Sequence, residues 1–182
     1  MSEEFKDIPV RHGEDEVNAS LAAEMPLRLR EPPETGHAKA HLLLQAHFSR
    51  STSRLPVADY ITDTASVLDQ TPRLLAAMLD CAALHGRLAV ALRCALLGQM
   101  VARGLWVSDS PLLQLASIDS SHLSAFRRYE EKNKEEESYI ETLPELLDLI
   151  GPHPRYPGLH EVIGDRLSPN SIEKIRKVRQ TR

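Results

Sequence analysis

Two leucine- and alanine-rich stretches, separated by only a few residues, constrain the fold of this chain most. The first runs over residues 64–84 and the second over residues 87–104, and a glycine closes each. Apolar stretches of this length predict α-helices, with Gly86 and Gly104 in the usual position after a helix C-terminus. Because the link is so short, we expect the two helices to pack as an antiparallel pair.

Two further helices are expected before this pair. Residues 12–25 combine helix-forming residues with an acidic first turn, and residues 26–36 contain three prolines and predict a connector. Residues 37–50 predict a second helix, in which His41, Gln45 and Ser49 share a face opposite the apolar one. Residues 51–63 predict a polar loop, with Asp63 or Thr64 capping the helix that follows.

The C-terminal part contains shorter helical patterns. Asp119, Ser120 and Ser121 are good caps for a helix that begins at about Ser120. Thr142 has the pattern of an N-cap with Pro144 in the first turn, and two more short helices are expected within residues 156–179. Because no segment alternates with a period of two, we predict an all-α chain without a β domain.

The charged stretch at residues 132–138 is the best internal boundary. We therefore expect an N-terminal helix and connector at residues 1–36, a helical bundle at 37–131, and a helix-loop-helix segment with a basic tail at 139–182. The last twelve residues have a net charge of +4, which is typical of a solvated chain end, with a weak phosphate-binding tail as the alternative.

Composition narrows the class of protein. Hydrophobic residues make up 42% of the chain but aromatic residues only 4%, which favours packed helices over a β-sandwich. The net charge of −4 excludes a strong basic field over the whole chain. Cys81 and Cys94 lie in apolar, helix-forming sequence, and their spacing does not form a disulfide pattern. The sequence contains neither a signal-peptide pattern nor an apolar run of about 18 residues, the length needed to span a membrane. The sequence therefore predicts a soluble intracellular protein.

Several groups of residues have side chains that occur in catalytic or metal sites. His37 and His41 have the spacing that places two imidazoles on one helix face, but no third ligand is evident. Asp119, Ser121 and His122 adjoin in sequence, where a capping turn is the simpler explanation than a triad. No lysine-containing phosphate loop or acidic helicase box is present. We therefore predict no catalytic residue, no metal and no cofactor, with an enzyme acting through a histidine site as the least favoured hypothesis.

Five sequence motifs are more specific to one protein family than ordinary helix-forming sequence would be. They occur in one order with short spacers: IPVRHGEDEVNASLA, KAHLLLQAHFSR, LPVADYITDTASVLDQ, RLLAAMLDCAA and DSPLLQL. Together they resemble the Sec-sixty-three homology region of Ski-like superfamily-two RNA/DNA helicases, more closely its coactivator-complex branch than its spliceosomal branch. The resemblance is strong from about Asp7 to Leu115 and weak through YIETLPELL.

The resemblance implies a helical bundle beside an ATP-dependent motor, followed by a helix-loop-helix. One long helix of the bundle, the ratchet helix, lines the channel of the translocating strand. By position, SVLDQTPRLLAAMLD corresponds to that helix and Arg73 to its nucleic-acid-contacting arginine. Gln70 and Asp80 complete the expected nucleic-acid-binding set.

Pro72 departs from the family pattern, which has Gln-Ala-x-Arg where this chain has Gln70-Thr71-Pro72-Arg73. A proline inside a helix costs about 3 kcal/mol, whereas it is favoured at a first helical position. We therefore predict a break or kink near Asp69–Thr71 and a second helix from Pro72 to about Leu84.

Two functions are expected from these residues. The first is a non-catalytic accessory module of a helicase in the nucleus, also reaching the cytoplasm, which guides a single strand weakly beside the motor domains. The second is a docking module for other subunits of a helicase-containing complex. For Arg73, strand contact and an ion pair with Asp69 and Asp80 on the same face stay open as alternatives.

Overall fold

The computed structural model describes residues 8–51, 55, 58–115, 118–128, 138–150, 169 and 172. The elements are α1 (Glu14–Glu24), α2 (Gly36–Phe48), α3 (Ala58–Leu84), α4 (Leu88–Arg103), η2 (Pro111–Gln114), η3 (Ser120–Ala125), β1 (Arg127–Arg128), β2 (Ser138–Tyr139) and α5 (Leu143–Ile150). Among the described residues, all regular secondary structure is helical apart from the two-residue antiparallel pairing of β1 with β2. The predicted all-α class is confirmed.

By its internal contacts the chain divides into two compact units. Residues 1–107 form the N-terminal unit and residues 108–182 form the C-terminal unit. The boundary expected from the sequence, at residues 132–138, lies within the second of these units. The division into segments 1–36, 37–131 and 139–182 stays a prediction.

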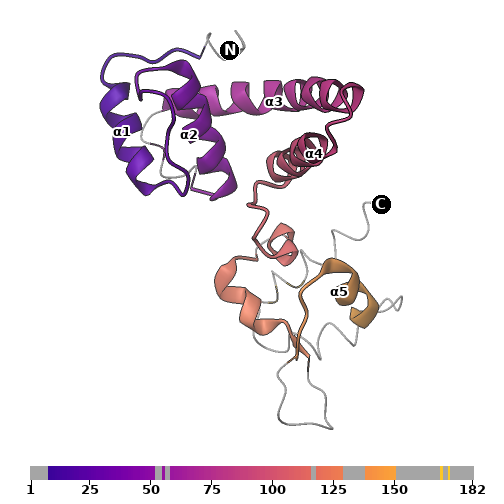
Figure 1. Cartoon of the computed structure of the whole chain (residues 1–182). Helices are drawn as coiled ribbons and strands as arrows, with labels where there is room; N and C mark the ends of the chain where they lie inside the picture. The colour runs from indigo at the N-terminus through magenta and orange to yellow at the C-terminus, as the bar shows by residue number, and fades with distance from the viewer. Residues whose placement is uncertain are drawn as a thin grey trace. The chain divides into compact units, whose positions relative to one another are not determined.

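Helices α3 and α4 form the hairpin that the short link predicts. A side-chain carbon added at Gly98 of α4 would lie 3.9 Å from the Leu75 side chain of α3, so the two helices are in van der Waals contact at this glycine. Gly86 and Gly104 adopt the left-handed conformation, with φ of 63° and 61°, in which a side chain would be strained. Figure 1 shows α3 as a single long coil that turns into α4 at its far end.

Helix α2 is buried on more than one face, which its sequence pattern did not predict. Gln45, expected on a polar face, is buried and holds the connector in place. Its Oε1 accepts a hydrogen bond from the Leu27 N–H at 2.8 Å, and its Nε2 donates to the Leu27 carbonyl at 2.9 Å. The connector folds over α2, which removes the Leu27 N–H and carbonyl from water. The Gln45 side chain supplies the hydrogen-bond partners that these two backbone groups would otherwise lack.

Helix α3 begins earlier than the sequence predicts. Its first residue is Ala58, so Asp63 and Thr64 lie inside the helix instead of capping it. Tyr60 is fully buried in a cluster with Leu43 of α2, and this packing secures the first turns of the helix. The Thr64 hydroxyl donates to the Tyr60 carbonyl at 2.6 Å. Tertiary packing therefore overrides the local capping signal.

The predicted break near Asp69–Thr71, with a second helix starting at Pro72, is wrong. Helix α3 runs without interruption through the proline to Leu84. Pro72 has no N–H to donate to the Leu68 carbonyl one turn earlier, and the 2.6 Å hydrogen bond from the Thr71 hydroxyl goes to the Val67 carbonyl, so it does not replace the missing bond. The helix instead has buried anchors on both sides of the proline, because Val67 belongs to a cluster with Leu43 of α2 and Leu75 to a cluster with Val101 of α4. Two such buried side chains contribute about 1.5–3 kcal/mol each, which offsets the cost of one proline.

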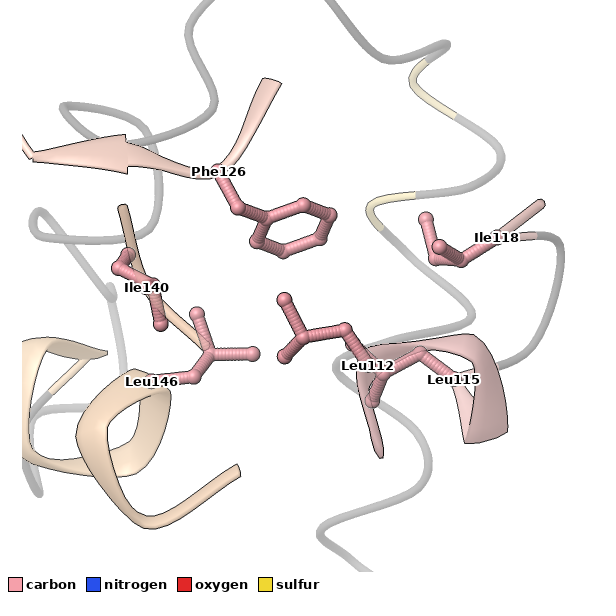
Figure 2. Packing of buried hydrophobic residues seen from close by; sticks show 6 residues of the cluster. All are labelled: Leu112, Leu115, Ile118, Phe126, Ile140 and Leu146. Carbon is pink, nitrogen blue, oxygen red and sulfur yellow. The ribbon is translucent and has the colours of Figure 1, made fainter. Parts of the chain in front are cut away.

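The C-terminal unit has its own small core. Figure 2 shows the side chains that form it: Leu112, Leu115, Ile118, Phe126, Ile140 and Leu146. Asp119 caps η3 as predicted, and the Thr142 hydroxyl accepts a hydrogen bond from the Glu145 N–H at the start of α5. The two short helices expected within residues 156–179 lie almost wholly outside the described residues.

Candidate nucleic-acid interface

The exposed face of α3 is the side turned away from α4. Val67, Thr71 and Leu75 point inward and are buried, whereas Pro72 and Arg73 are exposed. With 100° of rotation per residue, Arg73 lies roughly opposite Leu75 on the helix surface. Since α4 covers the Leu75 side, the guanidinium of Arg73 is presented to solvent.

Arg73 has no ion pair within the part of the chain that the structure describes, although Asp69 lies one turn before it. The salt bridges among these residues are concentrated elsewhere, around Lys39 and Arg11. The ion-pair alternative for Arg73 is thus not the arrangement found. Among the described residues, no ion pair would have to break before a ligand reached this exposed arginine.

Gln70 and Asp80 share this exposed face, one turn before and two turns after Arg73. Gln70 is half-buried and its Nε2 donates to the Ser66 hydroxyl at 3.5 Å, a long hydrogen bond. Asp80 is exposed and lies about 10 Å along the helix axis from Arg73. With Asp69 and Asp80 beside one arginine, the face has a net charge of −1, which limits its attraction for a polyanion.

A buried ion network holds the N-terminal half of α3, and the sequence analysis missed it. Lys39 of α2 is completely buried, and its Nζ donates to Glu14 at 2.7 Å, to Asp63 at 2.6 Å and to the Pro9 carbonyl at 2.9 Å. All three ammonium hydrogens therefore have acceptors. Arg11 adds a second cation with a 2.8 Å contact to Asp63, so two buried carboxylates face two cations.

The network also involves Tyr60. The Lys39 ammonium lies 4.5 Å from the centre of the Tyr60 ring, and the Tyr60 hydroxyl donates to Asn18 at 2.8 Å. Three helices and the N-terminal segment at Pro9 thus meet at one lysine. A signal was available in the sequence, since Lys39 occupies the same helical face as Leu43, but a single lysine is more often at the surface.

The network changes the acidity of its members. Burial alone would raise the pKa of Glu14 and of Asp63, but the hydrogen bonds from Lys39 and Arg11 outweigh it and hold both pKa values below their ordinary range. Burial, reinforced by the neighbouring carboxylates, raises the pKa of Tyr60 to about 12. At neutral pH both carboxylates are therefore ionised and Tyr60 is a neutral donor.

Acid is expected to destabilise the N-terminal unit through Glu14 and Asp63. Their pKa values are lower in the folded than in the unfolded chain, where they lie near 4, so the unfolded chain binds more protons on acidification. Their stabilisation is complete above about pH 4.5 and is lost as the pH falls through the lowered values. The urea midpoint of helix unfolding, followed by circular dichroism from neutral to acid pH, measures this. In a Glu14→Gln/Asp63→Asn variant the acid-dependent part should shrink; an unchanged profile would contradict the assignment.

The other groups considered for chemistry have structural roles. Asp119 Oδ1 accepts from the Ser121 N–H at 2.9 Å and His122 Nδ1 accepts from the Asp119 N–H at 3.2 Å, which is a reciprocal helix cap. His47 Nε2 lies 2.8 Å from the Val101 carbonyl and ties α2 to α4. Within the described residues, no three His, Cys, Asp or Glu side chains gather as metal ligands around His37 or elsewhere.

Two further findings concern the expected class of protein. Cys81 is exposed and Cys94 is buried, and both are free thiols. No helix among the described residues combines the length and the hydropathy needed to cross a membrane.

The N-terminal unit consists of helices, and the long helix α3 packs against α2 and α4. The protein is therefore of the helical-domain class. The Sec63 Brl domain family matches residues 1–164. The chain therefore belongs to the Sec63 Brl domain family, and the resemblance expected from the sequence strings is confirmed.

The relatives of this chain include a cointegrator complex subunit from two species and, at lower identity, a small nuclear ribonucleoprotein helicase. The chain is 44% identical over 155 residues to activating signal cointegrator 1 complex subunit 3 of Homo sapiens, covering 82% of this chain and 7% of that protein. The same subunit from Gallus gallus is 43% identical over 152 residues, with coverage of 80% and 7%. The U5 small nuclear ribonucleoprotein 200 kDa helicase of Homo sapiens is more distant, at 38% over 121 residues, with coverage of 66% and 6%. The chain thus spans less than a tenth of each relative's length.

Proposed function

We propose that this chain is a non-catalytic accessory module of an ATP-dependent RNA/DNA helicase, and that α3 guides a single strand past Arg73. The exposure of Arg73, with no ion pair within the described residues, supports strand contact over internal pairing. The family membership and a relative named as a helicase support the accessory role. The ATP chemistry belongs to a motor outside this sequence.

The proposed mechanism is positional. Arg73 offers a guanidinium to one backbone phosphate at a time, and Gln70 offers an amide that both donates and accepts. Asp80 has acceptors only, so its contacts are with hydroxyl or amino hydrogens and not with phosphate. With a net charge of −1 on this face, the module binds weakly by itself and guides a strand that the motor already holds.

Replacing Arg73 by alanine is expected to weaken the binding of labelled single-stranded RNA or DNA several-fold, because one phosphate contact is lost. The slope of log affinity against log salt concentration should fall by about 0.7 for single strands. Fluorescence anisotropy of a labelled homopolymeric strand, titrated with the full chain at several salt concentrations, measures both quantities.

Arg28 supplies the matched control for this experiment, because it is an exposed arginine on the connector away from α3. Arg28→Ala should leave affinity and salt slope unchanged. Tight strand binding that survives Arg73→Ala would contradict the role assigned to α3.

The proposed partners are the motor domains of a helicase and other subunits of its complex. The printed names of the relatives, a cointegrator complex subunit and a small nuclear ribonucleoprotein helicase, support such assemblies and a nuclear location, with the cytoplasm as a second compartment. The alternative function, docking of another protein, is supported by a separate observation on the far side of the hairpin, where α4 exposes leucines.

A further inference from the structure

Helix α4 is apolar on two faces. Its inner face contributes Cys94 and Val101, both buried beside α3. Its outer face has Leu88, Leu92 and Leu96, which are 70%, 56% and 44% exposed. These three leucines recur every four residues and form one stripe, and Leu92 lies about 200° around the helix from Cys94.

A second apolar stripe is not needed for the packing of this hairpin. A helix on the surface of a globular unit normally has polar residues opposite its buried face, and a helix that is apolar all round is normally covered. Single exposed leucines are common, but here three exposed leucines follow one stripe of α4, and Leu84 at the end of α3 is also 86% exposed. A contiguous apolar surface of this kind is typical of an interaction site.

The charges around the stripe restrict what can cover it. Residues 87–103 contain three arginines and no Asp or Glu. Arg87, Arg93 and Arg103 are all exposed. A second copy of α4 packed on this face would bring like charges together, whereas an acidic partner would neutralise them.

We propose that the outer face of α4 docks an amphipathic helix of another polypeptide segment, whose apolar stripe is bordered by Asp and Glu residues. The three leucines span about 12 Å, which matches apolar anchors at positions i, i+4 and i+8 of a facing helix. Arg93 borders the leucine stripe and Arg103 continues beyond it, so acidic flanks would meet both. This site is separate from the strand contact, because Arg73 lies on the side of α3 turned away from α4.

Two labelled helical peptides of identical leucine spacing test the proposal, one with glutamate flanks and one with lysine flanks. Fluorescence anisotropy with the full chain is expected to give binding of the glutamate peptide at least tenfold tighter than of the lysine peptide. Leu88→Gln/Leu92→Gln/Leu96→Gln should weaken the glutamate complex at least tenfold, because the exposed anchors are lost.

A charge-reversed variant keeps the test independent of any effect of the leucine changes on folding. Arg93→Glu/Arg103→Glu leaves every leucine in place and should reverse the preference toward the lysine peptide. Circular dichroism checks that each variant keeps its helix content. The Arg73→Ala variant should bind the glutamate peptide as the parent chain does, which separates this site from the proposed strand contact.

Three outcomes would overturn the proposal. The first is equal binding of both peptides, or binding of neither. The second is self-association of the parent chain in sedimentation that the leucine variant abolishes, which would assign the face to a second copy. The third is binding to anionic lipid vesicles or to a single strand that depends on the leucines while the glutamate peptide does not bind.

Discussion

Replacing Lys39 by methionine is expected to destabilise the N-terminal unit by about 3–5 kcal/mol. The substitution keeps much of the side-chain volume but leaves Glu14 and Asp63 ionised and short of a cation in a site where Lys39 is completely buried. Removing one partner of a buried charge cluster costs more than the cluster contributes as a whole, because the remaining charges lose their compensation. The free energy of unfolding from urea titration, followed by helix circular dichroism, measures the effect.

Two companion variants separate charge imbalance from lost packing. Adding Glu14→Gln and Asp63→Asn to Lys39→Met removes the uncompensated carboxylates, so part of the lost stability should return. Arg28→Met, at an exposed position, should stay within about 0.5 kcal/mol of the parent chain. A loss below about 1 kcal/mol for Lys39→Met would mean that the network does not hold the elements together.

Replacing Pro72 by alanine is expected to stabilise the N-terminal unit by up to about 3 kcal/mol. Because α3 is continuous through this position, alanine restores the missing N–H donor and removes the ring from the preceding turn. Pro72 is exposed, so the smaller side chain leaves no cavity in the core. Urea titration of parent and variant chains gives the difference directly.

Thr62→Ala is the matched control, because Thr62 is exposed on α3 and alanine there improves only intrinsic helix propensity. It should contribute at most about 0.7 kcal/mol. If Pro72→Ala gave no more than this control, the proline would be acting as the start of a new helix and α3 would be divided in solution.

Gly86, Gly104, Asp119 and Thr142 were placed correctly from sequence, since each acts on its own backbone or on neighbours within a turn. Gln45 was placed on the wrong kind of face, because its partner, the backbone of Leu27, comes from a connector whose path the sequence does not reveal.

At the candidate nucleic-acid site, too, the sequence supplies the residues and the tertiary structure decides their surroundings. The family resemblance supplied Gln70, Arg73 and Asp80, but whether Arg73 would pair with Asp69 or face solvent depended on side-chain positions. In the described residues it faces solvent without an ion pair. The sequence predicts only that residues 87–104 form an apolar helix, because hydropathy alone does not show which of the two apolar faces of α4 a neighbour covers.

Local interactions were enough to establish from the sequence that this chain is helical and that glycines end the two helices of its hairpin, because these properties depend on residues within about one helical turn. The family was recognised differently, from ordered strings spread over about 110 residues. The continuity of α3 through Pro72 and the buried cluster at Lys39 were decided only in the tertiary structure. Each depends on residues brought together from separate elements, whose burial and charge compensation outweigh the local preferences of proline and lysine.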